Sequence, residues 1–254
     1  MTELCIIKIG GRPLAEPESL KVLCGEIERI NRDTPVALIH GGGSEVSRIS
    51  RIFGLEPVFV DGLRSTSEEE MAVVEMVLAG RMNTLLVRSL AARGMRAVGL
   101  SGCDAGMLIA EPAAPGSRTG RIVACDGKLI TDLIQGSYLP VCSSVAMDNQ
   151  GEALNINADE AALEIAAAVE ASRLIYLSDV PGILLDKRVV PVLGPEEAEK
   201  KIHAGEIAGG MIPKVRSSFQ GLSRGIGEII IGGCDREGDL PALLQGSGTH
   251  LRLN

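Results

Sequence analysis

Short apolar runs alternate along the chain with longer segments in which apolar residues recur every three to four positions. The short runs predict β-strands near residues 4–9, 35–39, 95–100, 139–143, 173–178 and 226–231. The longer segments predict helices near residues 17–32, 44–53, 66–91, 157–170 and 196–221, the last broken at Gly205. This alternation is typical of an α/β fold with a mostly parallel central sheet. Because several strand segments, such as VALI and LIYL, are apolar throughout, we expect helices on both faces of the sheet.

Two shorter segments, residues 54–62 and 120–128, have the pattern of β-hairpins. Each contains an Asp-Gly pair, which is typical of tight hairpin turns. A polar, glycine-containing segment at residues 147–154 interrupts the pattern near the middle of the chain. We therefore expect two lobes, residues 1–150 and 151–254, with a hinge between them.

The composition is that of a globular protein, with 45% hydrophobic and 23% charged residues. No apolar run approaches the roughly 18 residues of a membrane span, and the amino terminus lacks the pattern of a signal peptide, so we expect a cytoplasmic protein. A net charge of −8 and 2% aromatic residues argue against nucleic-acid binding. The six cysteines have no metal-ligand spacing, and we expect buried thiols.

Glycine-rich turns follow two of the predicted strands. The first strand leads into Gly10–Gly11, and the strand that ends at His40 leads into residues 41–43, with Ser44 as a possible N-cap of the next helix. In parallel sheets such turns lie at one edge and open helix N-termini, whose free N–H groups favour anions. We therefore expect the two turns to bind an anion in one crevice. The alternative is that the glycines only make tight turns between strand and helix.

Several charged side chains lie where they could meet such an anion. Lys8 stands in an otherwise apolar strand, where a buried ammonium group is costly unless it has a charged partner. Asp159 lies in the first turn of a helix that Asn157 can cap, and Lys214 lies at a later helix start. The fork of Arg64 suits a carboxylate. Each also has an ordinary interpretation, as a solvated lysine or arginine on the surface or as helix capping.

Other nucleotide and hydrolase motifs are absent or out of context. There is no Walker A sequence, and no GxGxxG opens a helix after a strand. Residues 221–225 match GxSxG around Ser223, with Asp235 or Asp239 and then His250 following in hydrolase order. A nucleophile elbow needs a strand before the serine and a helix after it, and here the predicted order is reversed, so a serine hydrolase is disfavoured.

Seven segments in this order resemble the motif series of the amino acid kinase family: IIKIGG, HGGG, DGLR, GLSGCD, LNINAD, LSDVPGIL and GGMIPK. The resemblance extends from residue 4 to about residue 252. Within the family, DGLR and LNINAD together resemble members that phosphorylate N-acetyl-L-glutamate. The resemblance implies a three-layer αβα sandwich with a mainly parallel central sheet. It also implies an N-terminal lobe for the acyl amino acid and dimerisation, and a C-terminal lobe for ATP.

The same resemblance implies transfer of the γ-phosphoryl group of MgATP to the side-chain carboxylate of N-acetyl-L-glutamate. Lys8 and Lys214 would neutralise charge on the transferring group, and Asp159 would hold both lysines. The substrate-binding residues would be Gly42, Gly43, Arg64 and Asn155. The ATP-binding residues would be Gly10, Gly11, Ser178, Asp179, Val180, Gly182, Ile183, Leu184, Ile207, Ala208, Gly209, Gly210 and Met211. No residue is implied as a metal ligand, and Mg²⁺ would be held mainly by the ATP phosphates.

The sequence departs from the family pattern at several positions. Thr84 and Cys103 stand where the family usually or often has lysine, and the wording around residues 120–127 is altered. The sequence also lacks, before its first strand, the extra helix of members that form arginine-inhibited hexamers. We therefore expect a homodimer without strong arginine feedback.

Two alternatives to this function stay open at this level. One is a related kinase for another acyl or carrier-linked amino-dicarboxylate, and the other is a non-catalytic nucleotide-binding regulator on the same fold. The presence of Lys8, Asp159 and Lys214 together argues against the regulator, which would not need all three. Phosphoryl transfer to a carboxylate needs no general base, because the nucleophile is already ionised, but it does need cations that cancel repulsion between two anions.

Overall fold

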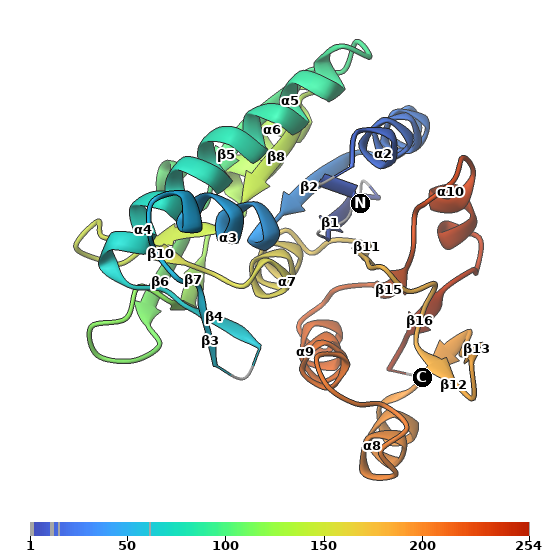
Figure 1. The fold of residues 1–254 in the computed structure, drawn as a ribbon. Coiled ribbons are helices and arrows are strands. Elements are labelled where there is room, and N and C mark those ends of the chain that lie inside the picture. The colour runs from blue at the N-terminus through green and yellow to red at the C-terminus, as the bar shows by residue number, and fades with distance from the viewer. Residues whose placement is uncertain (1–2, 11–12, 15, 61, 254) are drawn as a thin grey trace.

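An eight-stranded sheet runs through the middle of the molecule in the computed structural model, which describes residues 3–10, 13–14, 16–60 and 62–253 (Figure 1). Its strands are β1 (Cys5–Ile9), β2 (Val36–His40), β5 (Ala97–Ser101), β8 (Leu139–Ser143), β11 (Arg173–Leu177), β14 (Val192–Leu193), β15 (Glu228–Gly232) and β16 (Thr249–Leu251). Their spatial order is β14-β16-β15-β11-β1-β2-β8-β5. In this spatial order, each strand from β15 through to β5 runs parallel to its neighbour, whereas β16 runs antiparallel to β15. The predicted strands and the mostly parallel sheet are thereby confirmed.

Helices cover both faces of this sheet. They are α2 (Pro17–Asn31), α3 (Gly43–Ile52), α4 (Glu68–Glu75), the π-helix η1 (Met76–Met82), α5 (Asn83–Ala91), the short η2 (Asp104–Gly106), α6 (Lys128–Gln135), α7 (Ala158–Ala168), α8 (Pro195–His203), α9 (Met211–Ser223) and α10 (Asp239–Leu244). The single helix expected at residues 66–91 is continuous but changes to π geometry between α4 and α5. The break expected at Gly205 is confirmed, because α8 ends at His203 and α9 begins at Met211.

Two apolar cores lie on opposite faces of the sheet, because successive residues of a strand point to opposite sides. Ile6, Ile39 and Tyr176 face α7 and α9 in one core. Ile7 and Leu38 face α2, α5 and α10 in the other. These two cores make the molecule the three-layer αβα sandwich that the resemblance implied.

A second sheet and two hairpins lie beside the central sheet. The second sheet has the order β10-β9-β6-β7 and consists of β6 (Leu108–Pro112), β7 (Gly120–Cys125), β9 (Val145–Met147) and β10 (Ala153–Asn155). The hairpins are β3 (Val58–Val60) with β4 (Leu63–Ser65), and β12 (Leu184–Leu185) with β13 (Arg188–Val189).

One of the two predicted hairpins is present and the other is not. The first exists, but it extends to Ser65, and Gly62 lies in its turn before Leu63, whereas Asp61 lies outside the described residues. The second prediction was wrong: β7 pairs with the preceding strand β6, and Gly127 is the N-cap of α6 rather than part of a hairpin turn. A local turn signal cannot distinguish these cases, because the partner of a strand is set by tertiary pairing.

Strand β1 lies at the centre of the sheet, between β2 and β11. In Figure 1 the segments from β2 to β10 lie on one side of β1 and those from β11 to β16 on the other. The expected hinge region forms the turn between the paired strands β9 and β10, in which Asp148 accepts hydrogen bonds from the Gln150 and Glu152 N–H groups. The division into lobes at residue 150 stays a prediction. No helix in the described part of the chain is long and apolar enough to cross a membrane.

Candidate active site

A cleft of about 280 Å³ opens where β1 and β2 end, close to the size typical of small-molecule sites. The glycine-rich turn after β2, the β3–β4 hairpin and the start of α7 form its walls. Among the residues expected to act, it is lined by Lys8, Gly10, Gly42, Gly43, Arg64, Asn155 and Asp159. Gly11 lies outside the described residues. The cleft therefore gathers the described catalytic and substrate-binding candidates apart from Lys214.

Two lysines converge on one aspartate at this cleft. Lys8 extends from β1 and its Nζ lies 2.8 Å from Oδ1 of Asp159, which stands in the first turn of α7. Lys214, in the first turn of α9, donates a hydrogen bond to Oδ2 of the same carboxylate. All three side chains are largely buried, with 14% of Lys8, 13% of Lys214 and 26% of Asp159 exposed. The group carries a net positive charge at the edge of the cleft.

The surroundings of this group shift the pKa values of Asp159 and Lys214. Burial by itself raises the pKa of Asp159, but the two ammonium groups outweigh burial and hold that pKa below its ordinary value. Burial lowers the pKa of Lys214, an effect that Asp159 opposes and Lys8 reinforces. The Lys214 ammonium also lies 4.5 Å from the centre of the Tyr176 ring, and Tyr176 donates a hydrogen bond to the Asp159 carbonyl. Asp159 is thus an ionised anchor for two cations.

The start of α7 is arranged as its sequence predicts. Asn157 is the N-cap, and its side-chain oxygen accepts hydrogen bonds from the N–H groups of Asp159 and Glu160. This capping fixes the first turn of α7 and therefore the direction in which Asp159 points.

Arg64 is a buried side chain on β4 rather than a surface charge. Its guanidinium donates to Glu70 at 2.6 Å, to the Gly43 carbonyl at 2.9 Å and to Ser47 at 2.5 Å. The Phe59 ring lies beneath it, 4.9 Å away. Among the described partners, these bonds leave one N–H on Nε and one on Nη1 that could each donate to an anion in the cleft.

Asn155 is tied to Arg64 through two threonines. Its side-chain amide donates to Thr66 Oγ1 at 2.9 Å, and the Thr66 N–H donates to Thr119 Oγ1. Thr119 in turn donates to the Arg64 carbonyl at 2.6 Å. This network joins three segments of the chain around one wall of the cleft.

Sequence reasoning missed Glu70, Ser47, Thr66 and Thr119. Glu70 stands three residues after Ser67, a spacing that indicates a helix capping box, and Ser67 does accept a hydrogen bond from the Glu70 N–H. The capping-box spacing accounts for the hydrogen bond from the Glu70 N–H to Ser67. It does not account for the Glu70 carboxylate, which binds Arg64. The two threonines and Ser47 carry no recognisable local signal.

The glycines of the two turns differ in the space available for a side chain. A Cβ on Gly10 would lie 2.8 Å from the Leu177 carbonyl oxygen, and one on Gly42 would lie 2.9 Å from Leu78. A Cβ on Gly43 would meet nothing within 4 Å among the described residues, because its position faces open space. Helix α3 begins at Gly43 with Gly42 as N-cap, so the expectation that Ser44 caps it was wrong.

The residues expected to bind ATP lie farther along the same sheet edge. Residues 178–184 follow β11, and residues 207–211 lead into α9. Ile183 and Ile207 are buried in the core, and Gly182 packs against Val189 and Thr249. Asp179 lines a second cavity of about 510 Å³ beyond β11 and β15. Pro181 lines this cavity too, whereas the remaining residues of the two segments line neither cavity, so their ATP role stays a prediction.

Two of the departures from the family pattern, Thr84 and Cys103, lie away from the cleft, whereas Gly120 in the altered segment 120–127 lines it. Thr84 is exposed on α5, and Cys103 is half-buried in the turn after β5. Neither lines the cleft. No three or more His, Cys, Asp or Glu residues of the described ranges are grouped as a metal site would require.

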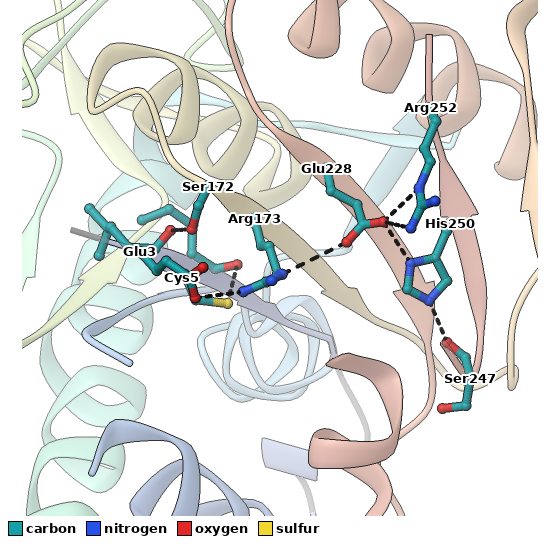
Figure 2. Close-up of polar contacts among 10 residues, drawn as sticks. Glu3, Cys5, Ser172, Arg173, Glu228, Ser247, His250 and Arg252 are labelled. Atoms are coloured by element: carbon teal, nitrogen blue, oxygen red, sulfur yellow. Dashed lines mark hydrogen bonds and ion pairs between the residues drawn. The ribbon is translucent and has the colours of Figure 1, made fainter. Parts of the chain in front are cut away.

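The hydrolase interpretation fails on geometry. Ser223 is the last residue of α9 and donates to the Phe219 carbonyl, so a helix precedes it and strand β15 follows. Figure 2 shows both ring nitrogens of His250 engaged: Nδ1 lies 2.9 Å from Glu228 and Nε2 lies 3.0 Å from the Ser247 carbonyl. Glu228 also binds Arg252 and approaches Arg173 (Figure 2). This cluster ties the last strand to the sheet.

Comparison with known proteins agrees with this geometry. The chain matches the Amino acid kinase family over residues 3–233. A protein described as acetylglutamate kinase from Chloroflexus aurantiacus is 39% identical over 236 residues, covering 91% of this chain and 92% of the relative. A second, from Geobacillus kaustophilus, is 40% identical over 233 residues, covering 91% and 90%. The crystal structure of smu.665 from Streptococcus mutans UA159 shares the fold, with a TM-score of 0.84 at 23% identity over 100% of both chains. This chain belongs to the amino acid kinase family.

Proposed function

We propose that this protein transfers the γ-phosphoryl group of MgATP to the side-chain carboxylate of N-acetyl-L-glutamate, a step of arginine biosynthesis. The observation that carries the proposal is the convergence of Lys8 and Lys214 on Asp159 beside the cleft. The two relatives described as acetylglutamate kinase cover about nine tenths of the chain and support this substrate.

The reaction brings an anionic acceptor to an anionic donor. The acceptor carboxylate is ionised at neutral pH, so no general base is required, and the main barrier is repulsion between the two anions. Lys8 and Lys214 are placed to cancel this repulsion, and Asp159 keeps both ammonium groups on one side of the cleft. The N–H groups at the start of α3 add partial positive charge from the Gly42 and Gly43 side.

The wall of the cleft that carries Arg64 and Asn155 would recognise the substrate. The two remaining N–H donors of Arg64, one on Nε and one on Nη1, point in different directions, so each can donate a single hydrogen bond to a carboxylate, and the guanidinium is held in place by Glu70. Asn155 offers an amide on the same wall, next to Thr66. We infer that Arg64 binds the α-carboxylate of the substrate and Asn155 the acetylamino group.

Mg²⁺ would be held mainly by the phosphates of ATP. Asp159 is the carboxylate nearest the lysines, and two ammonium groups already occupy its oxygens. Bound in that way, the metal would supply additional charge neutralisation. ATP itself would bind at residues 178–184 and 207–211, in a C-terminal lobe, and a homodimer in the cytoplasm completes the proposal.

An ATP-dependent hydroxamate assay tests the function. N-acetylglutamate, N-succinylglutamate, glutamate and aminoadipate derivatives are offered side by side, because an acyl phosphate product reacts with hydroxylamine. The expected result is rapid product with N-acetylglutamate alone. A preference for another acyl or carrier-linked derivative would assign a different substrate, and no product with any of them would support the regulator. Light scattering tests the dimer, and added arginine tests the absence of feedback.

A further inference from the structure

His40 forms a hydrogen-bonded bridge between the glycine turn and the helix layer behind it. Its side chain is fully buried, with Nδ1 2.8 Å from the Gly41 carbonyl oxygen and Nε2 3.1 Å from Nδ2 of Asn83. A carbonyl oxygen only accepts hydrogen bonds, so Nδ1 carries the proton and Nε2 accepts from the Asn83 amide. Burial lowers the pKa of His40 to about 4, which keeps the ring neutral at physiological pH.

Asn83 is itself held firmly. It stands at the point where the π-helix η1 gives way to α5, and it is buried. The same Nδ2 also lies 2.8 Å from the Val141 carbonyl oxygen of β8 and 3.1 Å from the Leu100 carbonyl oxygen of β5, so its two N–H groups are shared among three acceptors. Gly99 makes this possible, because a Cβ there would lie 2.1 Å from Asn83 Oδ1. The absence of a side chain at residue 99 thus admits the Asn83 amide to the sheet.

The Gly41–Gly42 peptide needs such a support. Glycines on both sides of a peptide bond allow it to rotate between orientations that other residues exclude. In a trans peptide the carbonyl and the N–H point in opposite directions. Fixing the Gly41 carbonyl against His40 therefore directs the Gly42 N–H away from the ring. Gly42 lines the cleft, and its N–H has no acceptor among the described residues.

We propose that His40 and Asn83 are positioning residues that hold the Gly41–Gly42 peptide with its N–H directed into the cleft, toward the reacting anions. The inference rests on the proposed function and adds to it the source of one oriented donor. A Cβ on Gly42 would lie 2.9 Å from Leu78 and 3.1 Å from Met82 of η1, so the continuous helix that leads into Asn83 also limits the position of Gly42.

Three substitutions test the bridge without touching the cleft. His40→Gln changes the ring, Asn83→Ala removes its partner, and Gly99→Ala displaces the Asn83 amide while leaving both side chains chemically intact. We expect each to lower kcat about 10- to 100-fold, as loss of an oriented donor does, with the KM for ATP within about twofold of wild type. Because the residues act as one unit, the kcat of the His40→Gln/Asn83→Ala double variant should be no lower than that of the less active single variant.

Two controls separate positioning from simple stability. Ser143→Ala changes a buried residue paired with His40 in the neighbouring strand, and its hydroxyl has no hydrogen-bond partner among the described residues. Leu90→Ala removes buried volume from α5 outside the bridge and the cleft. Both should keep wild-type kcat, although Leu90→Ala lowers the melting temperature. Equal losses of kcat in Leu90→Ala and the three test variants would overturn the proposal.

Crystal structures of the Gly99→Ala and Asn83→Ala proteins provide a readout independent of activity. The expected result is a rotated Gly41–Gly42 peptide, or two orientations of it, with α3 otherwise unchanged. A peptide that keeps its orientation in both variants would refute the role of the bridge. If wild-type protein does not phosphorylate N-acetylglutamate, the proposed function fails, whereas these structures still decide the inference about the peptide.

Discussion

The Lys8 ammonium lies 2.8 Å from Oδ1 of Asp159, although Lys8 belongs to the first strand and Asp159 to a helix far along the chain. Lys214 binds the other oxygen of the same carboxylate. One aspartate therefore sets the separation and direction of two cations that would otherwise repel each other.

Asp159→Asn should lower kcat at least about 100-fold and change both KM values much less. The amide keeps the shape of the side chain but loses the charge that holds the two ammonium groups, whose main effect is on the transition state. Steady-state kinetics measures both constants. Glu164→Gln, on the same helix, removes a carboxylate that pairs with Arg224 at the surface, and it should leave kcat unchanged. Equal kcat in Asp159→Asn and wild type would remove the mechanism.

Arg64→Lys should raise the KM for N-acetylglutamate about 10- to 100-fold while the KM for ATP stays near its wild-type value. An ammonium group has three N–H donors, and binding Glu70, Gly43 and Ser47 would use all of them, so none would be left for a carboxylate. Varying one substrate at a time gives the two constants. The matched control is Arg48→Lys, which alters an exposed ion pair with Glu45 on α3. An unchanged KM for the acyl amino acid would contradict the assignment of this wall.

The free energy of unfolding should depend on pH through His40. Its pKa is about 4 in the folded protein against an ordinary 6.5, so the unfolded chain binds more protons between these values. Stability therefore falls as pH drops through this window. The advantage of wild type over His40→Gln should shrink by about 2 kcal/mol between pH 7 and pH 5, because one pKa unit is about 1.4 kcal/mol. Urea unfolding of both proteins at the two pH values measures this change, and a constant difference would argue against a buried neutral imidazole.

Glu26→Ala should destabilise the fold without changing kcat. Glu26 is 1% exposed on α2, and its Oε2 accepts hydrogen bonds from the Gly238 and Leu240 N–H groups at the start of α10. Truncation leaves one buried and one half-buried donor unpaired, which costs roughly 2–3 kcal/mol in urea unfolding. Glu28→Ala, two residues away in exposed ion pairs, should destabilise the fold much less. Similar losses in both variants would show that the contact with α10 contributes nothing specific.

Periodicity alone was sufficient for the main strands and helices. Helices cover both faces of strands β1, β2, β8 and β11, so both faces are mostly apolar. The continuous apolar runs in their sequences therefore indicate their burial directly. The pairing of β7 with β6 was missed, since either neighbouring segment could supply the partner strand. The ordered motifs were sufficient to identify Lys8, Asp159 and Lys214 as a set, and their family resemblance implied the roles proposed for them.

The sequence by itself determined the layered α/β architecture and the glycine turns, because periodicity and backbone freedom are local properties of residue type. Only the tertiary structure decided that Arg64 is buried against Glu70 and that Asn83 enters the sheet at Gly99 to reach His40. These contacts join residues that are distant in the chain, and a hydrogen bond depends on distance and direction in space. A side chain such as Glu70 or Asn83 therefore acquires its role only when the layers pack together.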